Sequence, residues 1–102
     1  MTSKELFDAL TTFKYGSKEP LNETVSVLSY EVGRMLEQAM YMKWGQADAK
    51  EIQVRMGFFK SELIDAITQL HLICESIGVD YEEMKELGFE KAYERFIGKE
   101  KK

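Results

Sequence analysis

The sequence predicts an all-α protein: an antiparallel helical bundle of about four helices, built around a long central hairpin and completed by oligomerisation. Apolar residues recur at helical spacing along the chain, and its 7 glycines and single proline separate the periodic stretches. No tight turn joins two alternating apolar runs, so nothing predicts a β-hairpin. We expect one domain over residues 1–97 and a charged tail over residues 98–102.

The first two expected helices cover residues 3–14 and 22–45. Asn22 is a good N-cap for the second helix, and Gly45 is a good C-terminal stop. The apolar stripe of the first helix is Leu6, Phe7, Leu10 and Phe13. The apolar stripe of the second helix is Val25, Leu28, Val32, Met35, Leu36, Ala39 and Met42.

The third expected helix covers residues 48–78 and the fourth runs from the N-cap Asp80 to near Gly98. At 1.5 Å per residue the third helix is about 45 Å long, which exceeds what a small core can cover. Part of its apolar surface is therefore expected to face another subunit, in a homodimer or homotetramer. Its stripe is Ile52, Met56, Phe59, Leu63, Ile67, Leu70, Cys74 and Ile77.

Composition excludes several functional classes. The formal net charge of -4 argues against a protein that binds nucleic acid, because such binding depends on clustered Lys and Arg. Cys74 is the single cysteine, so an intrachain disulfide and a cysteine-based metal site are both excluded, and we expect its thiol to be buried. No apolar run approaches the length of a membrane span, so we expect a cytoplasmic protein.

Three carboxylates are expected to meet on the central hairpin. Glu62 and Asp65 lie one turn apart on the third helix. If the hairpin turns at Gly45, Glu31 lies about 21 Å before the turn and Glu62 about 20 Å after it. The three acids then face one another at the edge of the seam, whereas Glu37 points away into solvent.

Clustered carboxylates at a partly buried position repel one another, so such a site either stays hydrated or binds a cation. Oxygen ligands without Cys or His favour a hard cation, Mg²⁺ or Mn²⁺. These ions keep some of their waters and accept substrate phosphates as further ligands. The pattern therefore indicates phosphoanhydride chemistry, in which a metal ion neutralises phosphate charge and activates a water.

The stretches YEVGRMLEQA (30–39), KSELIDAITQLHLICESIGVD (60–80) and GFEKAYERF (88–96) resemble the MazG-like, all-α nucleotide pyrophosphatase family. Glu62 and Asp65 match its E-x-x-D motif, and Glu31 matches the second Glu of its E-E-x-x-E motif. The resemblance implies that these three residues are catalytic and hold Mg²⁺. It also implies a dimer or tetramer that hydrolyses a nucleoside triphosphate to the monophosphate and pyrophosphate.

Two positions depart from the first acidic motif of the family. Tyr30 and Arg34 stand where further glutamates are expected, and arginine cannot ligate a cation. Two roles for Arg34 are open: it binds a substrate phosphate, or it forms an ion pair with Glu62 or Asp65. The second role leads to an alternative function, a catalytically degenerate oligomeric helical protein that binds a nucleotide or a protein partner.

The remaining candidate substrate-binding residues are two cations and two aromatics. Lys91 and Arg95 stand where the resemblance implies contacts with phosphates, and the alternative is pairing with neighbouring glutamates on the helix surface. Tyr41 and Phe58 share the flank of the acids and are candidates to stack on a base; the alternative is a place in the core or an interface. Phe59 belongs to the main stripe and is assigned to the core.

Overall fold

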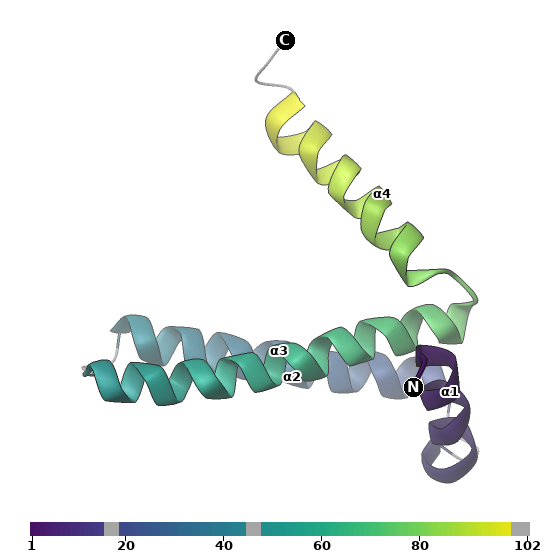
Figure 1. The fold of residues 1–102 in the computed structure, drawn as a ribbon, viewed down its shortest axis with the longest axis horizontal. Helices are drawn as coiled ribbons and strands as arrows, with labels where there is room; N and C mark the ends of the chain where they lie inside the picture. Colours follow the sequence, from purple (N-terminus) through teal and green to yellow (C-terminus); the bar gives the residue numbers. More distant parts are fainter. Residues whose placement is uncertain (16–18, 45–47, 99–102) are drawn as a thin grey trace.

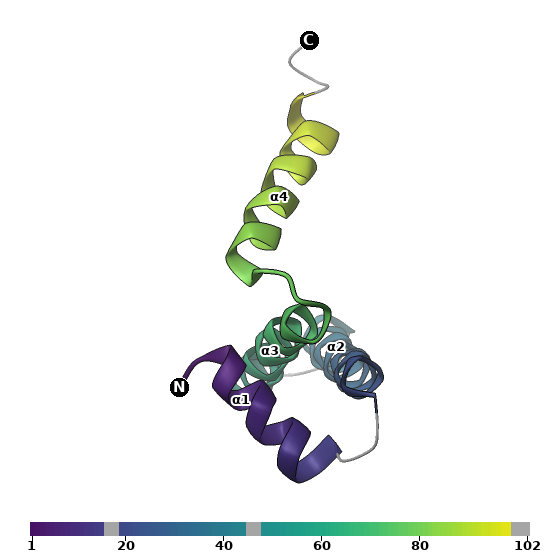
Figure 2. The same ribbon diagram turned by 90° about the vertical axis from the view of Figure 1, so that its right-hand side faces the viewer.

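The computed structural model describes residues 1–15, 19–44 and 48–98, and these ranges contain helices and no β-strand. Helices α2 and α3 form a long antiparallel hairpin, α1 lies against α3, and α4 rises away from one end of the hairpin (Figures 1 and 2). The all-α fold and the central hairpin predicted from the sequence are thus confirmed. In chain order the elements are α1 (Ser3–Leu10), the π-helical segment η1 (Thr11–Tyr15), α2 (Pro20–Trp44), α3 (Ala49–Ile77), α4 (Tyr81–Tyr93) and the π-helical segment η2 (Glu94–Gly98).

The starts of the helices follow capping chemistry. The Asp48 carboxylate accepts a hydrogen bond from the Glu51 amide at 2.9 Å, and Asp80 accepts one from the Glu83 amide at 2.9 Å. α2 begins at Pro20, two residues before the expected N-cap Asn22, because proline suits the first turn of a helix. The expected stop at Gly45 and the tail residues 99–102 lie outside the described residues.

A tight elbow separates α3 from α4. Gly78 adopts φ 75°, and the Val79 amide donates to the Cys74 carbonyl at 3.0 Å, as in a Schellman C-cap. Beyond the elbow, the ring of Tyr81 stacks on His71 with the ring centroids 3.6 Å apart. The elbow thus ends α3 where the sequence predicts and starts α4 in a new direction.

The elbow gives a test of the fold. Gly78→Ala is expected to lower the free energy of unfolding by about 1 kcal/mol, because alanine is strained at positive φ although no atom lies within 4 Å of the added Cβ. The matched control is Gly57→Ala within α3, where the new Cβ also meets open space. That change should raise the free energy of unfolding by about 0.5–1 kcal/mol. Urea denaturation of both variants measures the two shifts, and equal signs would contradict this account of the elbow.

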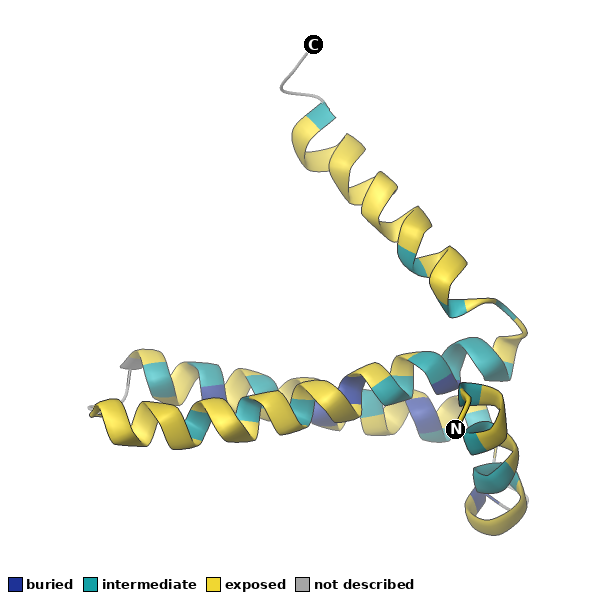
Figure 3. Ribbon diagram, viewed as in Figure 1, coloured by how far each residue is buried: buried dark blue, intermediate teal, exposed yellow. Residues whose placement is uncertain are grey.

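The seam between α2 and α3 is more polar than the apolar stripes predict. Thr24, Glu31 and Gln38 are the buried residues of α2 among those described, and they recur every seven residues on the face toward α3. Ala66 of α3 is buried as well. Hence the hairpin encloses polar side chains along its length, whereas most of the ribbon of α2 and α3 is coloured as exposed in Figure 3.

Most of the predicted apolar stripes are consequently exposed. Leu36 of α2 is 60% exposed, and Leu63 and Ile67 of α3 are each 42% exposed. On a helical wheel both stripes lie about 90° from the direction of the partner helix, on the same side of the hairpin. The stripes therefore do not form the centre of the α2–α3 contact, which Thr24, Glu31, Gln38 and Ala66 occupy. The other stripe residues at least 39% exposed are Val25, Val32, Ile52, Met56, Leu70 and Ile77.

Other core assignments also change. Phe13 is 86% exposed, because η1 replaces the last turn of the expected first helix. Phe59 and Cys74 are half-buried rather than buried, and burial raises the pKa of the Cys74 thiol. Leu72, which lies outside the predicted stripe, is only 1% exposed and lines a cavity together with Leu6 of α1. The best-buried apolar contact thus joins α3 to α1. Among the described residues, no helix is both long and apolar enough to span a membrane.

Candidate metal centre

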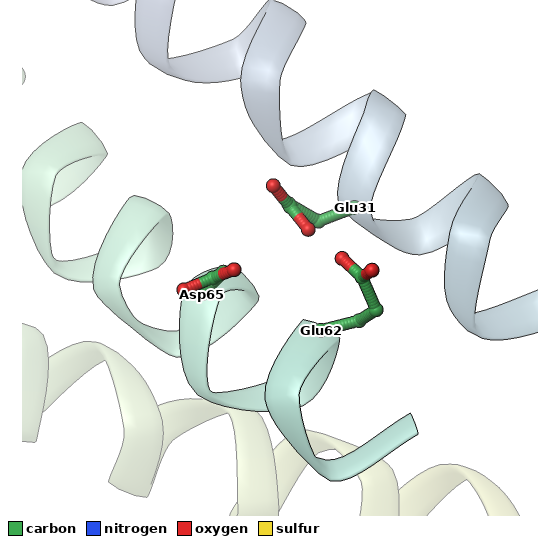
Figure 4. Close-up of side chains that lie close together, drawn as sticks. All are labelled: Glu31, Glu62 and Asp65. Carbon is green, nitrogen blue, oxygen red and sulfur yellow. The ribbon is translucent and has the colours of Figure 1, made fainter. Parts of the chain in front are cut away.

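Three carboxylates meet midway along the hairpin. Glu31 projects from α2, and Glu62 and Asp65 project from α3 toward it (Figure 4). One carboxylate oxygen from each residue lies within 4.8 Å of the others. The helical heights predicted from the sequence are therefore confirmed, since Glu31 meets two acids that lie 31 or more positions later in the chain.

Burial differs sharply among the three acids. Glu31 is 8% exposed, the side chain of Glu62 is 14% exposed, and Asp65 is exposed. A hydrogen bond with Glu62, then burial, then the charges of Glu62 and Asp65 raise the pKa of Glu31 to about 7, although Arg34 acts in the opposite direction. The same hydrogen bond, followed by Arg34, lowers the pKa of Glu62 against the effect of burial. Glu31 is thus the member of the cluster whose protonated form is favoured over the widest pH range.

Two buried acceptor atoms in this region lack donors. Among the described residues, no donor reaches Glu31 Oε2 or Gln69 Oε1. Gln69 lies one turn beyond Asp65 on α3, so both atoms lie along the same seam. A buried oxygen without a partner is costly, and a cation or its hydration waters would satisfy it. An oxygen-rich site of this kind fits Mg²⁺ or Mn²⁺.

Arg34 reaches across the hairpin to the cluster. Its Nε donates to Glu62 Oε1 at 2.9 Å, and its Nη1 donates to the Tyr30 hydroxyl at 3.0 Å. The guanidinium also lies 5.5 Å from the centroid of the Tyr30 ring. One of the two roles considered for Arg34, the ion pair with Glu62, is therefore present in the structure. Tyr30 and Arg34, the two departures from the acidic motif, act together.

A second cluster lies two helical turns from the acids, toward the connection between α2 and α3. The Arg55 guanidinium stacks 3.8 Å from the centroid of the Tyr41 ring, and its Nη1 donates to Gln38 Oε1 at 3.3 Å. The Tyr41 hydroxyl donates to Glu51 Oε2 at 3.1 Å. Tyr41 and Phe58, the predicted stacking residues, line one cavity of about 280 Å³. Its other lining residues are Lys50, Glu51, Val54 and Arg55.

Arg55 and Gln38 were not among the sequence-based candidates. A spacing argument could have found them, because Gln38 lies seven residues after Glu31 and Arg55 lies seven residues before Glu62. Seven residues are close to two turns of helix, so both residues share the seam with the acids at a distance of about 10 Å. The seam is thus continuous from the acids to the aromatic cavity.

The two predicted phosphate-binding residues, Lys91 of α4 and Arg95 of η2, do not reach the acids within one chain. α4 diverges from the hairpin beyond the elbow (Figure 1), and both Lys91 and Arg95 are exposed. In the described part of the chain neither forms an ion pair, although the Arg95 guanidinium lies 5.9 Å from the centroid of the Phe96 ring. Within the described residues, Lys91 and Arg95 are thus neither placed next to the acids nor paired with neighbouring glutamates.

Comparison of the chain with protein-family models, curated proteins and solved structures gives no match. The resemblance to MazG-like pyrophosphatases therefore stays a prediction from the sequence motifs.

Proposed function

We propose that this chain is a MazG-like nucleotide pyrophosphohydrolase, which uses Mg²⁺ or Mn²⁺ to hydrolyse a nucleoside triphosphate to the monophosphate and pyrophosphate. The observation that carries the proposal is Glu31, a carboxyl 8% exposed whose Oε2 has no donor among the described residues and which faces Glu62 and Asp65. A cation at this point would satisfy the orphan oxygen and offset the repulsion among the acids.

The roles of the three acids follow from their positions. Glu31, Glu62 and Asp65 would hold the ion, which when bound neutralises phosphate charge and lowers the pKa of a water. Glu31 must give up its proton to ligate. Exposed Asp65 lies on the side open to solvent, where a phosphate chain has access.

The cavity next to the acids supports a nucleotide as substrate. It lies about 10 Å along the hairpin from the triad, so one ligand can extend its phosphates to the acids and its base into the cavity. Half-exposed Phe58 offers a stacking face there, whereas Arg55 covers one face of Tyr41. Arg55 has no carboxylate partner within ion-pair distance among the described residues, so it is available to an anionic or acceptor group.

A second copy of the chain is part of the proposal. A compact monomer of 11.8 kDa exposes about 5,900 Å², whereas this chain exposes 7902 Å². The difference, about 2,000 Å², is similar to the area that one subunit buries in a large homodimer interface. The exposed stripes of the hairpin and the exposed aromatics of α4 supply an apolar surface for it. In such an assembly Lys91 and Arg95 can reach phosphates at the partner's acids.

The ion pair of Arg34 with Glu62 at 2.9 Å favours a second candidate, the degenerate member that binds a nucleotide or a protein partner without hydrolysis. In that case the guanidinium permanently neutralises the acids. The two candidates differ in whether a metal ion enters the site.

A binding and product assay separates the candidates. The purified protein is titrated with Mg²⁺ and Mn²⁺, alone and with a panel of ribo- and deoxyribonucleoside triphosphates, and pyrophosphate release is measured. We expect metal-dependent stabilisation and pyrophosphate release, both lost in Glu62→Gln and both retained in the matched surface control Glu37→Gln. A nucleotide-induced rise in melting temperature without metal binding or product would select the degenerate member. No response to any metal or nucleotide would reject both.

A further inference from the structure

Arg34 holds the candidate metal ligand Glu62 from the solvent side. Its side chain is 44% exposed, whereas the side chain of Glu62 is 14% exposed. Nε donates to Glu62 and Nη1 donates to Tyr30, and among the described residues no other hydrogen bond of the guanidinium is formed. The Glu62 carboxylate is thus held within the seam, whereas the Arg34 guanidinium that pairs with it is partly exposed and can move into solvent.

A divalent ion among the acids changes the balance of forces on this pair. The ion draws on the Glu62 carboxylate, and its two positive charges repel the neighbouring guanidinium. Ion pairs whose cation is partly exposed are weak, so Arg34 can leave Glu62 at small cost. Tyr30, one turn away on α2, contacts the guanidinium through its hydroxyl and its ring and can retain it near the site.

We propose that Arg34 is an exchangeable counter-ion: it neutralises Glu62 while the site lacks metal and turns to a phosphate of the incoming ligand when a metal–polyphosphate complex binds. The inference rests on the metal site of the proposed function. In this proposal Arg34 has both of its predicted roles in turn: it pairs with Glu62 before the ligand binds and with a phosphate afterwards. The planar guanidinium fork suits phosphate oxygens as well as it suits a carboxylate.

The exchange predicts that metal and polyphosphate bind cooperatively. Metal alone must displace Arg34 from Glu62 and leaves the guanidinium without an anion. Metal that arrives with phosphate supplies the replacement partner. By linkage the coupling is reciprocal, so phosphate strengthens metal binding as much as metal strengthens phosphate binding. The ligand class selected by the site is therefore a metal-complexed polyphosphate.

The test compares Mn²⁺ alone with equimolar Mn²⁺–pyrophosphate, a product complex that the proposed reaction does not consume. Affinities are measured by calorimetry for the wild-type protein, Arg34→Met and the control Lys60→Met. Lys60→Met removes the same charge from an exposed position of α3 that points away from the acids. We expect Arg34→Met to bind Mn²⁺ alone at least about fivefold more tightly and Mn²⁺–pyrophosphate at least about fivefold more weakly. Lys60→Met should leave both affinities near the wild-type values.

Exchange of Arg34 between two anions predicts that Arg34→Met changes the two affinities in opposite directions. If Arg34→Met bound both ligands more tightly, Arg34 would be a simple plug and the inference would fail. The inference would also fail if only the affinity for Mn²⁺–pyrophosphate fell, or if neither affinity changed. In both cases, binding of Mn²⁺ would still support the metal site of the proposed function. If neither protein bound Mn²⁺ at all, the metal site itself would be rejected. Arg34→Lys, which keeps the charge without the fork, should lie between the wild-type protein and Arg34→Met.

Discussion

Replacing Glu31 by glutamine is expected to weaken Mn²⁺ binding by more than about 100-fold and to raise the melting temperature of the metal-free protein by a few degrees. Loss of a ligand should exceed the 10–100-fold effect of losing a residue that only supports one. Glutamine keeps the shape of protonated Glu31 and can donate to Glu62, but it never has to ionise in a buried position. Calorimetry and thermal unfolding at about pH 8, above the raised pKa, measure the two effects.

The same substitution should remove a pH dependence. The pKa of Glu31 is about 7 in the folded protein and 4.5 ordinarily, so the folded chain binds more protons between these values. Stability of the metal-free wild-type protein should therefore fall as the pH rises from 4.5 to about 7. The lowered pKa of Glu62 acts below this window, where its contribution to stability is lost as the pH falls. Mn²⁺ binding should strengthen as Glu31 loses its proton.

The matched control is Glu37→Gln, which removes the same charge from a solvent-exposed position of α2. It should leave both metal binding and the pH slope unchanged. A pH slope that survives in Glu31→Gln would assign the titration to another group. A fall in melting temperature at about pH 8 would show that Glu31 is stabilising as a carboxylate, against its raised pKa.

If the proposed homodimer forms, Leu36→Glu is expected to dissociate it and to lower the melting temperature strongly. Leu36 is 60% exposed in the isolated chain, where a glutamate would change the free energy of unfolding by no more than about 0.5 kcal/mol. In an interface formed by the apolar stripes, the same glutamate would be a buried charge without a partner, which costs several kcal/mol. Analytical ultracentrifugation and thermal unfolding over a range of protein concentrations measure the loss.

The control for this prediction is Ser26→Glu, an exposed position of α2 that points away from α3 and from the stripes. It should leave the oligomer intact. The wild-type melting temperature should rise with protein concentration, because assembly stabilises the folded chain by mass action. A monomer at all concentrations, equally stable with Leu36 or Glu, would contradict the assembly and leave the metal site untouched.

The elements of this fold are readable from local chemistry. Asp48, Asp80 and Gly78 mark helix ends because caps and left-handed turns are decided by a few neighbouring atoms. The meeting of Glu31 with the acids of α3 is also predictable, since equal heights on a hairpin need only the rise per residue. Local chemistry predicts these features correctly, although it places the start of α2 at Asn22 rather than at Pro20.

The neighbour of each helix face is harder to predict. Apolar periodicity marks a face that avoids water, but it does not say whether another helix of the same chain or another subunit covers it. For that reason the apolar stripes through Leu36 and Leu63 do not predict that Gln38 and Glu62 occupy the α2–α3 contact. Apolar periodicity does not set the direction in which α4 leaves the Gly78 elbow either, so it does not place Lys91 and Arg95.

A hairpin with a polar seam and a bare apolar face also has a consequence for how the chain folds. The contacts between α2 and α3 are closest in sequence near their connection, so the hairpin can zip from that end on the timescale of helical proteins, microseconds to milliseconds. Covering the apolar face, if a second copy does so, is a bimolecular step whose rate depends on concentration. A newly made chain would then exist for a time as a folded monomeric hairpin whose apolar face is exposed to solvent. Its net charge of -4 would make such monomers repel one another, which opposes aggregation before the correct dimer forms.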